Sequence, residues 1–292
     1  MPCGIKGNNI APGKEIIEKG GDISMDLTKE KFDIFIQAGQ SNAEGTGLGP
    51  VLKEYVSSEK VLYLSAEKEV TILQNGLKID YADKPFSVEL AKERCVDGKQ
   101  YGDFALTFSE EYIKNGLLKE DKKMLIVRAA VGGTGFYKKQ WGVGNILHSK
   151  MIEMVEYALS LNPENRVVGF LWHQGEHDAF EGNQPENYYN QLCGLVNDVR
   201  SRYGNMPFIC GDFVNEWKQL NIEQCTPIVE MIKKVSFDIG RSAFVETSDL
   251  LSNNQMIGNG DNIHFCRQDL QELGHRYFAA FKKLMEVEHE NF

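Results

Sequence analysis

The sequence lacks the features that would point to a membrane protein or a nucleic-acid-binding protein. No stretch approaches the roughly 18 consecutive apolar residues that a membrane-spanning helix needs, and Lys and Arg form no cluster. The 292-residue chain has 32 basic and 42 acidic residues, which gives a net charge of −10. An acidic chain without a basic cluster is poorly suited to holding phosphate backbones or anionic lipid. We therefore expect neither nucleic acid nor a membrane as a partner.

Paired cysteines and an apolar leader are also missing. The six cysteines are widely scattered without a C-x-x-C pair, so they need not form a disulfide framework. Cys193 and Cys210 stand in apolar runs, which is typical of small buried thiols. The first 15 residues contain no apolar core like that of a signal peptide. A reducing cytoplasm is the expected location, with secretion as the alternative if a leader has been removed.

Several motifs with a fixed spacing do not occur. The phosphate loop G-x-x-x-x-G-K-[ST] is absent, and Gly133 and Gly135 have no glycine at position 138 to complete G-x-G-x-x-G. The G-x-S-x-G elbow of α/β-hydrolases is missing at Ser41, because residue 43 is alanine. These absences disfavour a nucleotide site and an α/β-hydrolase.

Short apolar runs alternate with amphipathic segments along most of the chain. Each run has the length of a strand and is flanked by glycine or polar residues, as buried parallel strands are. The segments between them repeat apolar residues every three or four positions, which is typical of helices packed on a sheet. This alternation predicts a three-layer α/β domain whose parallel sheet is covered on both faces. The expected strands are residues 32–38, 124–131, 167–172, 207–213 and 243–247.

Two regions depart from the alternation. Residues 1–30 are rich in Gly, Lys and Glu without periodicity, and we interpret them as an N-terminal arm. Residues 31–292 form the single predicted domain, and residues 50–100 break its rhythm with short strands or a hairpin followed by a polar stretch. We interpret residues 50–100 as an insertion over one end of the sheet.

Polar residues that are capable of catalysis follow the expected strands. Ligands bind beyond the carboxyl ends of the strands in open α/β sheets, so residues that follow different strands are expected to meet there. The segments are Gly39-Gln40-Ser41-Asn42, Gly132-Gly133-Thr134-Gly135, His173-Gln174-Gly175-Glu176-His177-Asp178 and Asp261-Asn262-Ile263-His264.

Asp261 and His264 have a spacing that suits a catalytic pair. Three positions apart on a turn, the carboxylate reaches the near nitrogen of the imidazole and leaves the far nitrogen free to accept a hydroxyl proton. With Ser41 they make a Ser–His–Asp set, although a lone D-x-x-H is more often a turn or helix-cap pair. Gly132 and Gly133 either offer a backbone N–H to a developing oxyanion or simply turn the chain.

The stretch from His173 to His177 formally matches the inverted zinc-protease motif H-x-x-E-H. That motif needs a continuous helix with both histidines on one face, whereas here a strand-like run precedes it and a glycine interrupts it. With Glu246 as a third ligand it is a disfavoured alternative, and we expect no metal or other cofactor. Gln174 fits better as an amide donor toward an oxyanion at a strand end.

Together these blocks resemble the SGNH-type hydrolases, and among them the carbohydrate-esterase branch that includes sialate O-acetylesterases and acetylxylan esterases. GQSN at 39–42, HQGE-x-D at 173–178 and D-x-x-H at 261–264 match as they stand, and the glycine pair is a weaker match. The resemblance covers roughly residues 32–285. The sequence departs from the pattern at His177, where a small residue is usual, and at Trp141, which follows the glycine block only after FYKKQ.

The resemblance implies a flavodoxin-like α/β/α sandwich of about five parallel strands, and it implies roles for single residues. Ser41 is the nucleophile, His264 the general base and then acid, and Asp261 the residue that orients the histidine. The backbone N–H groups of Ser41 and of Gly133 (or Gly132), with the Gln174 side chain, form the oxyanion hole.

Two further residues stand beside this implied set. Asn42 is expected to hold the turn or face the substrate. Glu176 is expected to bond to the loops around the site, and the alternative is that it competes with Asp261 as the partner of His264.

The function implied by the resemblance is a serine esterase that removes acetyl groups from a carbohydrate such as sialic acid or xylan, through an acetyl-enzyme. Two alternatives stay open: an inactive carbohydrate-binding protein on the same fold, and the zinc hydrolase. Trp141, Trp172 and Trp217 are candidates for stacking on sugar rings, although we expect at least Trp172 to be packed in the core.

Overall fold

A seven-stranded sheet in the order β11-β10-β9-β1-β8-β2-β5 forms the centre of the computed structural model, which describes residues 26–49, 58–74, 76–96 and 99–289. All neighbouring strands are parallel except β5, which runs antiparallel to β2. The strands are β1 (Phe32–Gly39), β2 (Val61–Ser65), β5 (Ser87–Leu90), β8 (Lys123–Arg128), β9 (Arg166–His173), β10 (Phe208–Gly211) and β11 (Ser242–Val245).

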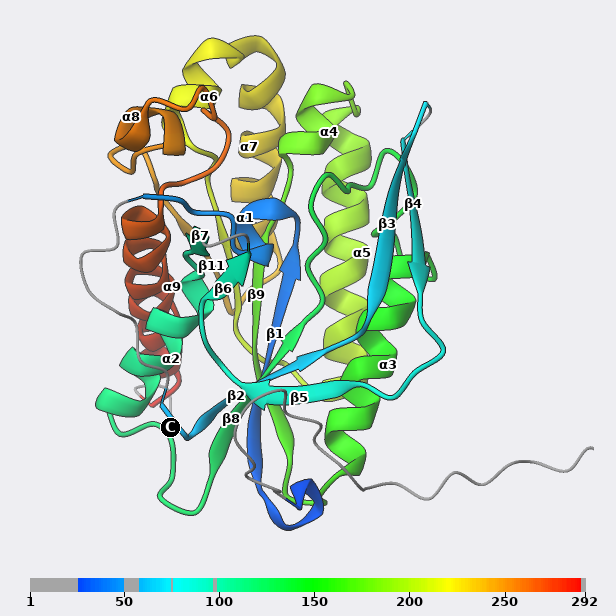
Figure 1. The fold of residues 1–292 in the computed structure, drawn as a ribbon, viewed down its shortest axis with the longest axis vertical. Coiled ribbons are helices and arrows are strands. Elements are labelled where there is room, and N and C mark those ends of the chain that lie inside the picture. Colours follow the sequence, from blue (N-terminus) through cyan, green and yellow to red (C-terminus); the bar gives the residue numbers. More distant parts are fainter. Residues whose placement is uncertain (1–25, 50–57, 75, 97–98, 290–292) are drawn as a thin grey trace, which may run out of the picture.

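Helices cover both faces of this sheet (Figure 1). On one face α2 (Phe104–Lys114) packs against α9 (Arg267–His289), and the other face carries α3 (Ile146–Ser160), α5 (Pro185–Tyr203) and α7 (Ile222–Asp238). The predicted three-layer α/β/α arrangement is therefore confirmed, with a sheet that is parallel except for β5. The shorter helices are η1 (Leu27–Lys29), α1 (Ser41–Glu44), α4 (Glu176–Phe180), α6 (Asn215–Leu220) and α8 (Asn253–Ile257).

Aromatic side chains from the central strands fill the two layers between sheet and helices. Phe35 of β1 packs edge-on against Phe108 of α2 and Phe281 of α9, with ring centroids 5.0 and 5.7 Å apart. From β9, Trp172 packs edge-on against Trp141 at 5.1 Å. Because the central strands are buried on both faces, they read in sequence as continuous apolar runs rather than as alternating ones.

The segment around residues 50–100 differs from the predicted insertion. Its strands β2 and β5 belong to the central sheet, which is therefore wider than the five strands predicted. The rest of the segment forms two antiparallel hairpins, β3 (Lys68–Leu73) with β4 (Gly76–Tyr81), and β6 (Arg94–Val96) with β7 (Lys99–Tyr101). The run in β2 was predicted as a short strand of the insertion, whereas it pairs with β8 in the central sheet; only Val61–Leu64 are buried before polar residues resume.

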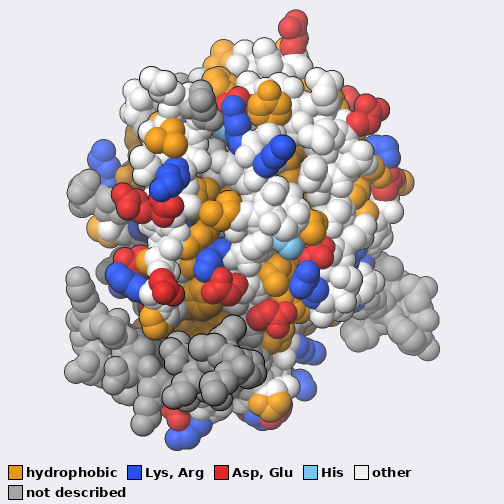
Figure 2. All heavy atoms as spheres, turned by 90° about the vertical axis from the view of Figure 1, so that its right-hand side faces the viewer, with side chains coloured by type: hydrophobic (Ala, Val, Ile, Leu, Met, Phe, Trp, Pro, Cys, Tyr) orange, Lys and Arg blue, Asp and Glu red, His pale blue; other side chains and the backbone are white. Residues whose placement is uncertain are grey.

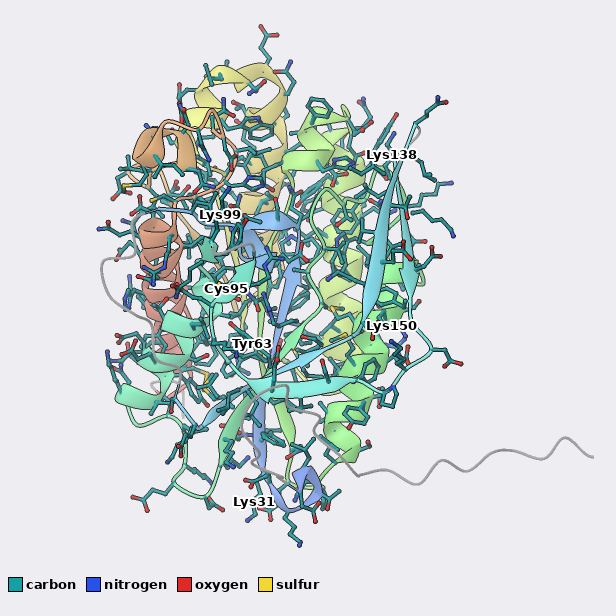
Figure 3. All side chains as sticks on the ribbon, viewed as in Figure 1. Lys31, Tyr63, Cys95, Lys99, Lys138 and Lys150 are labelled. Atoms are coloured by element: carbon teal, nitrogen blue, oxygen red, sulfur yellow. The ribbon has the colours of Figure 1, made fainter. Side chains whose placement is uncertain are left out.

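The β3–β4 hairpin lies against the layer that contains α3 (Figure 3). Lys150 of α3 has its Nζ 5.1 Å from the centre of the Tyr81 ring near the base of the hairpin. Near the tip, a Cβ on Gly76 would lie 4.0 Å from Cδ of Lys138. The hairpin is therefore supported at both ends by residues of the main domain.

Other sequence predictions have mixed outcomes in the fold. Residues 1–25 of the predicted N-terminal arm lie outside the described residues. The five described cysteines are free thiols, of which Cys210 is buried and Cys193 half-buried. Within the described ranges, no helix combines the length and apolarity that crossing a membrane requires. Acidic and basic side chains of the described residues lie interspersed on the face shown in Figure 2.

Candidate active site

Backbone hydrogen bonds join the carboxyl ends of β1, β8 and β9. The N–H of Gln40 donates to the carbonyl of His173 (3.0 Å), and the N–H of Val131 donates to the carbonyl of Gly39 (3.1 Å). Gly39 has a φ of +131°, and a Cβ there would lie 2.0 Å from the His173 carbonyl oxygen, so the crossing requires glycine. The structure thus brings the GQSN, glycine-pair and HQGE blocks together at one end of the sheet.

Ser41 is the first residue of α1 and directly follows the turn at the end of β1. The one-turn helix is closed by the N–H of Glu44, which donates to the carbonyl of Gln40, and by the N–H of Gly45, which donates to the carbonyl of Ser41. Ser41 is 8% exposed, and its Oγ has no hydrogen-bond partner among the described residues. The hydroxyl is therefore free to interact with a ligand or a base.

Asp261 and His264 form a hydrogen-bonded pair in the loop after α8. Both carboxylate oxygens of Asp261 lie 2.9 Å from Nδ1 of His264, and Nδ2 of Asn253 donates to the same carboxylate at 2.8 Å. Burial opposes ionisation of Asp261, but the hydrogen bonds from His264 and Asn253 outweigh it and lower its pKa. An ionised carboxylate at Nδ1 holds the proton there, so Nε2 is the basic nitrogen of His264.

The side chain of Asn42 ties the serine helix to the histidine loop. Its Nδ2 donates to the carbonyl of Ile263 (3.1 Å), and its Oδ1 accepts the N–H of Phe265 (3.1 Å). These two residues flank His264 in the sequence. Ser41 Oγ and His264 Nε2 do not bond to each other in this structure; Asn42 brings their segments together.

Glu176 is fully buried and bonds to Asn42 rather than to His264. Its Oε1 accepts the N–H of Asn42 Nδ2 at 2.9 Å, and its Oε2 has no partner in the described part of the chain. Burial raises the pKa of Glu176 against the opposing effects of Asn42 and the nearby His264. Of the two carboxyl groups considered for His264, Asp261 is the one that contacts it.

The two glycines after β8 differ in what their N–H groups contact. The N–H of Gly132 donates to Oε2 of Glu44 at 2.8 Å. Gly133 has a φ of +69°, and its N–H has no acceptor among the residues described. A Cβ on Gly132 would lie 3.5 Å from the Cβ of Ser41, so the loop passes close to the serine. Gly133 is thus the glycine whose N–H is available to a ligand.

Asp178 anchors the segment that follows these glycines. Its carboxylate accepts the backbone N–H groups of Phe136 (3.0 Å) and Tyr137 (2.8 Å), and also side-chain N–H groups of Gln174 and Asn183 (2.7 Å each). Sequence reasoning recognised Asp178 only as part of the HQGE-x-D block. Its contact with the glycine loop was missed, because a separation of 41 or 42 residues leaves no spacing signal.

The amide of Gln174 is 1% exposed and already makes contacts within the protein. Its Nε2 lies 2.7 Å from Oδ2 of Asp178, 3.1 Å from the carbonyl of Thr134 and 3.2 Å from Oε1 of Gln40. An amide nitrogen has two N–H groups, so three acceptors share them. The contact with Gln40 is the longest and is the one that a ligand displaces most easily.

The HQGEH stretch does not have the geometry of a zinc-protease motif. His173 is the last residue of β9 and His177 lies in α4, so no continuous helix carries both. Nδ1 of His173 contacts the hydroxyl of Tyr277 (3.0 Å), and burial lowers the pKa of His173 to about 3. Glu246, the conceivable third ligand, pairs with Lys233 at 2.8 Å. The zinc alternative therefore lacks the arrangement that it requires.

The tryptophans do not present a face to a sugar. Trp141 and Trp172 are fully buried and Trp217 is 7% exposed. The expectation of core packing for Trp172 is therefore confirmed, and it extends to the other two. Exposed aromatic rings include those of Tyr137 and Phe180.

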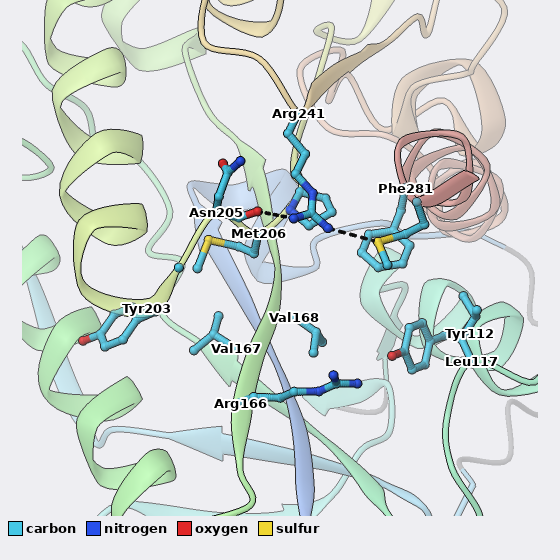
Figure 4. A pocket seen from close by; sticks show the side chains of 13 residues that line it. Tyr112, Leu117, Arg166, Val167, Val168, Tyr203, Asn205, Met206, Arg241 and Phe281 are labelled. Carbon is cyan, nitrogen blue, oxygen red and sulfur yellow. Dashed lines mark hydrogen bonds between the residues drawn. The ribbon is translucent and has the colours of Figure 1, made fainter. Parts of the chain in front are cut away.

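A cavity of about 300 Å³ lies at the opposite end of the sheet, near the amino ends of β9, β10 and β11 (Figure 4). Arg166, Met206, Arg241 and Phe281 are among the residues that line it. Ser41 follows the carboxyl end of β1, so this cavity is separate from the serine site.

Comparisons with known proteins point to one enzyme family. The chain matches the family model "SASA: Carbohydrate esterase, sialic acid-specific acetylesterase" over residues 31–283. A curated relative from Escherichia coli (strain K12), named probable 9-O-acetyl-N-acetylneuraminic acid deacetylase, is 25% identical over 89 residues. That match spans 27% of this chain and only 27% of the relative.

Solved structures share the fold. The crystal structure of NanS has a TM-score of 0.68 at 17% identity and covers 89% of this chain and 99% of its own. A carbohydrate acetylesterase from Xanthomonas citri has a TM-score of 0.61 at 16% identity, with 86% of this chain and 56% of its own covered. At identities of 17% and 16%, the similarity to these two structures shows a shared fold. Because the family model spans residues 31–283, the chain belongs to the carbohydrate esterase family of sialic acid-specific acetylesterases, which are carboxylic ester hydrolases.

Proposed function

We propose that the protein is a serine esterase that hydrolyses O-acetyl esters on a carbohydrate, with O-acetylated sialic acid as the favoured substrate. One observation carries this function: Asn42, next to the unbonded hydroxyl of Ser41, bonds to both residues that flank His264. Membership of the carbohydrate esterases supports the ester chemistry. The name of the Escherichia coli relative supports sialic acid over xylan.

In the proposed mechanism, Nε2 of His264 accepts the proton of Ser41 as Oγ attacks the acetyl carbonyl carbon. Asp261 holds the imidazole in the correct tautomer and stabilises its cation. His264 then donates the proton to the sugar oxygen as the ester bond breaks, which leaves acetyl on Ser41. A water molecule, deprotonated by His264, then attacks the acetyl carbon, and His264 returns the proton to Oγ of Ser41 as the bond between Oγ and the acetyl group breaks and acetate leaves.

The oxyanion of each tetrahedral intermediate is assigned to three donors. They are the N–H groups of Ser41 and Gly133 and the side-chain amide of Gln174. The free N–H of Gly133 supports its role, whereas the N–H of Gly132 is committed to Glu44. The substrate carbonyl takes over the N–H of Gln174 that now makes its longest contact, to Gln40 at 3.2 Å.

The test is hydrolysis of 9-O-acetylated sialic acid, acetylated xylan oligomers and a simple aryl acetate by the wild type and by Ser41→Ala. We expect the wild type to favour the sialic acid ester and Ser41→Ala to lose activity on all three, because no other group replaces the nucleophile. A fluorophosphonate probe should label the wild type and not the variant. Full activity in Ser41→Ala would exclude this mechanism. Sugar binding without hydrolysis or labelling in the wild type would favour the inactive carbohydrate-binding alternative.

A further inference from the structure

Glu44, the last residue of α1, is a polar group beside the catalytic residues that the mechanism above does not use. Its Oε2 accepts the N–H of Gly132 at 2.8 Å, and its Oε1 pairs with Nζ of Lys68 at 3.2 Å. Its side chain is 23% exposed. The carboxylate thus links the helix that begins at Ser41 to the loop that carries Gly133.

This link constrains the position of the glycine loop. A Cβ on Gly132 would lie 3.2 Å from Oε2 of Glu44 and 3.5 Å from the Cβ of Ser41, so the loop is packed tightly against both side chains. The hydroxyl of Thr134 donates to the carbonyl of Val131 at 2.6 Å, so the loop is also bonded to itself. Both bonds therefore hold the peptide between Val131 and Gly132, directly before Gly133, while the N–H of Gly133 stays available.

Positive charges keep Glu44 ionised. Burial raises its pKa, but Lys68, the N–H of Gly132 and Arg94 together outweigh burial and leave the pKa of Glu44 lowered. Nζ of Lys68 also lies 3.4 Å from the carbonyl of Ala130, just before the glycine loop. An ionised acceptor holds a backbone N–H more tightly than a neutral one does.

We propose, resting on the esterase function above, that Glu44 is a positioning residue for the oxyanion hole. Its bond to Gly132 sets the distance between the N–H of Gly133 and the carbonyl oxygen of an ester attacked by Ser41. Lys68, from the β3–β4 hairpin, holds the carboxylate in place. A displacement of about 1 Å in a catalytic group costs ~10²-fold in rate. Substitution of Glu44 therefore acts on kcat more than on KM.

The experiment compares steady-state hydrolysis of an acetyl ester by the wild type, Ser41→Ala, Glu44→Ala and Glu44→Gln. We expect Glu44→Ala to lower kcat by about 10- to 100-fold, with KM nearly unchanged, because a donor is misplaced rather than removed. Glu44→Gln keeps a neutral acceptor for the N–H of Gly132 and should recover most of this loss. Glu110→Ala is the matched control, since Glu110 also pairs with a lysine (2.9 Å) but on the surface of α2.

A second measurement separates positioning from a general loss of structure. Methylboronic acid forms a tetrahedral adduct with a serine hydroxyl, so its affinity should fall in Glu44→Ala by about the same factor as kcat/KM. The affinity for the deacetylated sugar, which places no oxyanion in the hole, should not change. If Glu44→Ala fails to fold in circular dichroism melts, Lys68→Met takes its place, with a smaller fall in kcat and in boronate affinity expected.

The outcomes distinguish this proposal from the one on which it rests. An inactive wild type, or an active Ser41→Ala, would overturn the esterase function itself. With an active wild type and an inactive Ser41→Ala, a full-rate Glu44→Ala would overturn only the role of Glu44. Equal losses in the Ala and Gln variants with unchanged boronate affinity would also overturn it.

Discussion

Two buried carboxyl groups near the proposed nucleophile are stabilised to different degrees. Asp178 accepts four N–H groups, whereas Glu176 accepts one and has an oxygen without a partner in the described residues. Burial raises the pKa of both groups above the ordinary value. A carboxyl group whose pKa is higher in the folded than in the unfolded protein stabilises the fold at pH values below the pKa of the unfolded state. This contribution is lost as the pH rises through the pKa of the folded state.

The Glu176→Gln variant tests this at a single residue, because Gln keeps an oxygen for Asn42 and cannot ionise. The unfolding free energy of the wild type should fall relative to that of the variant as the pH rises from about 4.3, the ordinary pKa of Glu, through the raised value. Each unit of pKa difference contributes about 1.4 kcal/mol. Urea denaturation at a series of pH values measures the unfolding free energies of the two proteins. A difference between them that does not change with pH would contradict the prediction. Since Asn42 keeps its acceptor, kcat should stay close to the wild-type value.

At the scale of elements, the β3–β4 hairpin borders the loop that contains Gly132 and Gly133. Lys68 of β3 pairs with Glu44, and Leu77 of β4 lies so close that a Cβ on Gly133 would be 3.2 Å from its Cδ1. Ile72, which pairs with Leu77 across the two strands, is 84% exposed. The side chain next to the proposed oxyanion donor is therefore apolar, and we expect it to contact the acyl group of the substrate.

We expect Leu77→Ala to widen the acyl preference of the enzyme. Removing this side chain makes room for added methylenes, each of which is worth about 10-fold or more in an apolar pocket. The ratio of kcat/KM for an aryl propionate, which has one more methylene, to that for the aryl acetate should rise about 10-fold. Ile72→Ala is the control on the same hairpin, and its ratio should match that of the wild type. An unchanged ratio in Leu77→Ala would place the acyl group elsewhere.

At the scale of the whole molecule, one buried carboxylate ties the sheet to a helix away from the catalytic end. Asp33 of β1 is fully buried and accepts bonds from Lys122 (3.0 Å), Arg166 (3.0 Å) and the hydroxyl of Tyr112 (2.9 Å). Burial raises its pKa, but Arg166 and Lys122 outweigh burial and leave the pKa of Asp33 lowered. A carboxyl group whose pKa is lower in the folded than in the unfolded protein stabilises the fold at pH values above the pKa of the unfolded state. This contribution is lost as the pH falls through the pKa of the folded state.

Asp33→Asn should therefore lower the unfolding free energy at neutral pH, and the loss should be smaller at acidic pH. Removing the charge leaves buried Lys122 without its counter-ion, which should lower the unfolding free energy by about 3 kcal/mol. This value is at the low end for broken buried ion pairs, because the other partner, Arg166, is 58% exposed. Urea denaturation followed by tryptophan fluorescence at neutral pH and near pH 3 tests the effect. We expect the difference between the two proteins to begin to shrink as the pH falls below about 3.9, the ordinary pKa of Asp, and to vanish below the lowered pKa of the folded state. A difference that stays constant with pH would contradict the assignment.

The sequence predicted the parts of the molecule that follow from local patterns. Buried parallel strands such as β1 and β9 are continuous apolar runs, and residues after such strands meet at one edge. The pairing of Asp261 with His264 was predictable because three positions separate them. The bond from Gly132 to Glu44 spans 88 positions and depends on how two loops pack. No propensity or spacing encodes such a contact. The pairing of the edge strand β5 with β2 in the central sheet likewise has no local signal in the sequence.

The hydrogen bond between Asn42 and Phe265 joins residues 223 positions apart in the chain. The proposed nucleophile therefore leaves the ribosome long before the histidine loop with which it must work, since synthesis proceeds from the N-terminus. The loops around Ser41 can be in place early, but the proposed base, His264, comes only after the last strand, β11, and the helix α8. Esterase activity during synthesis thus reports on completion of the fold, because no earlier intermediate contains both halves of the site.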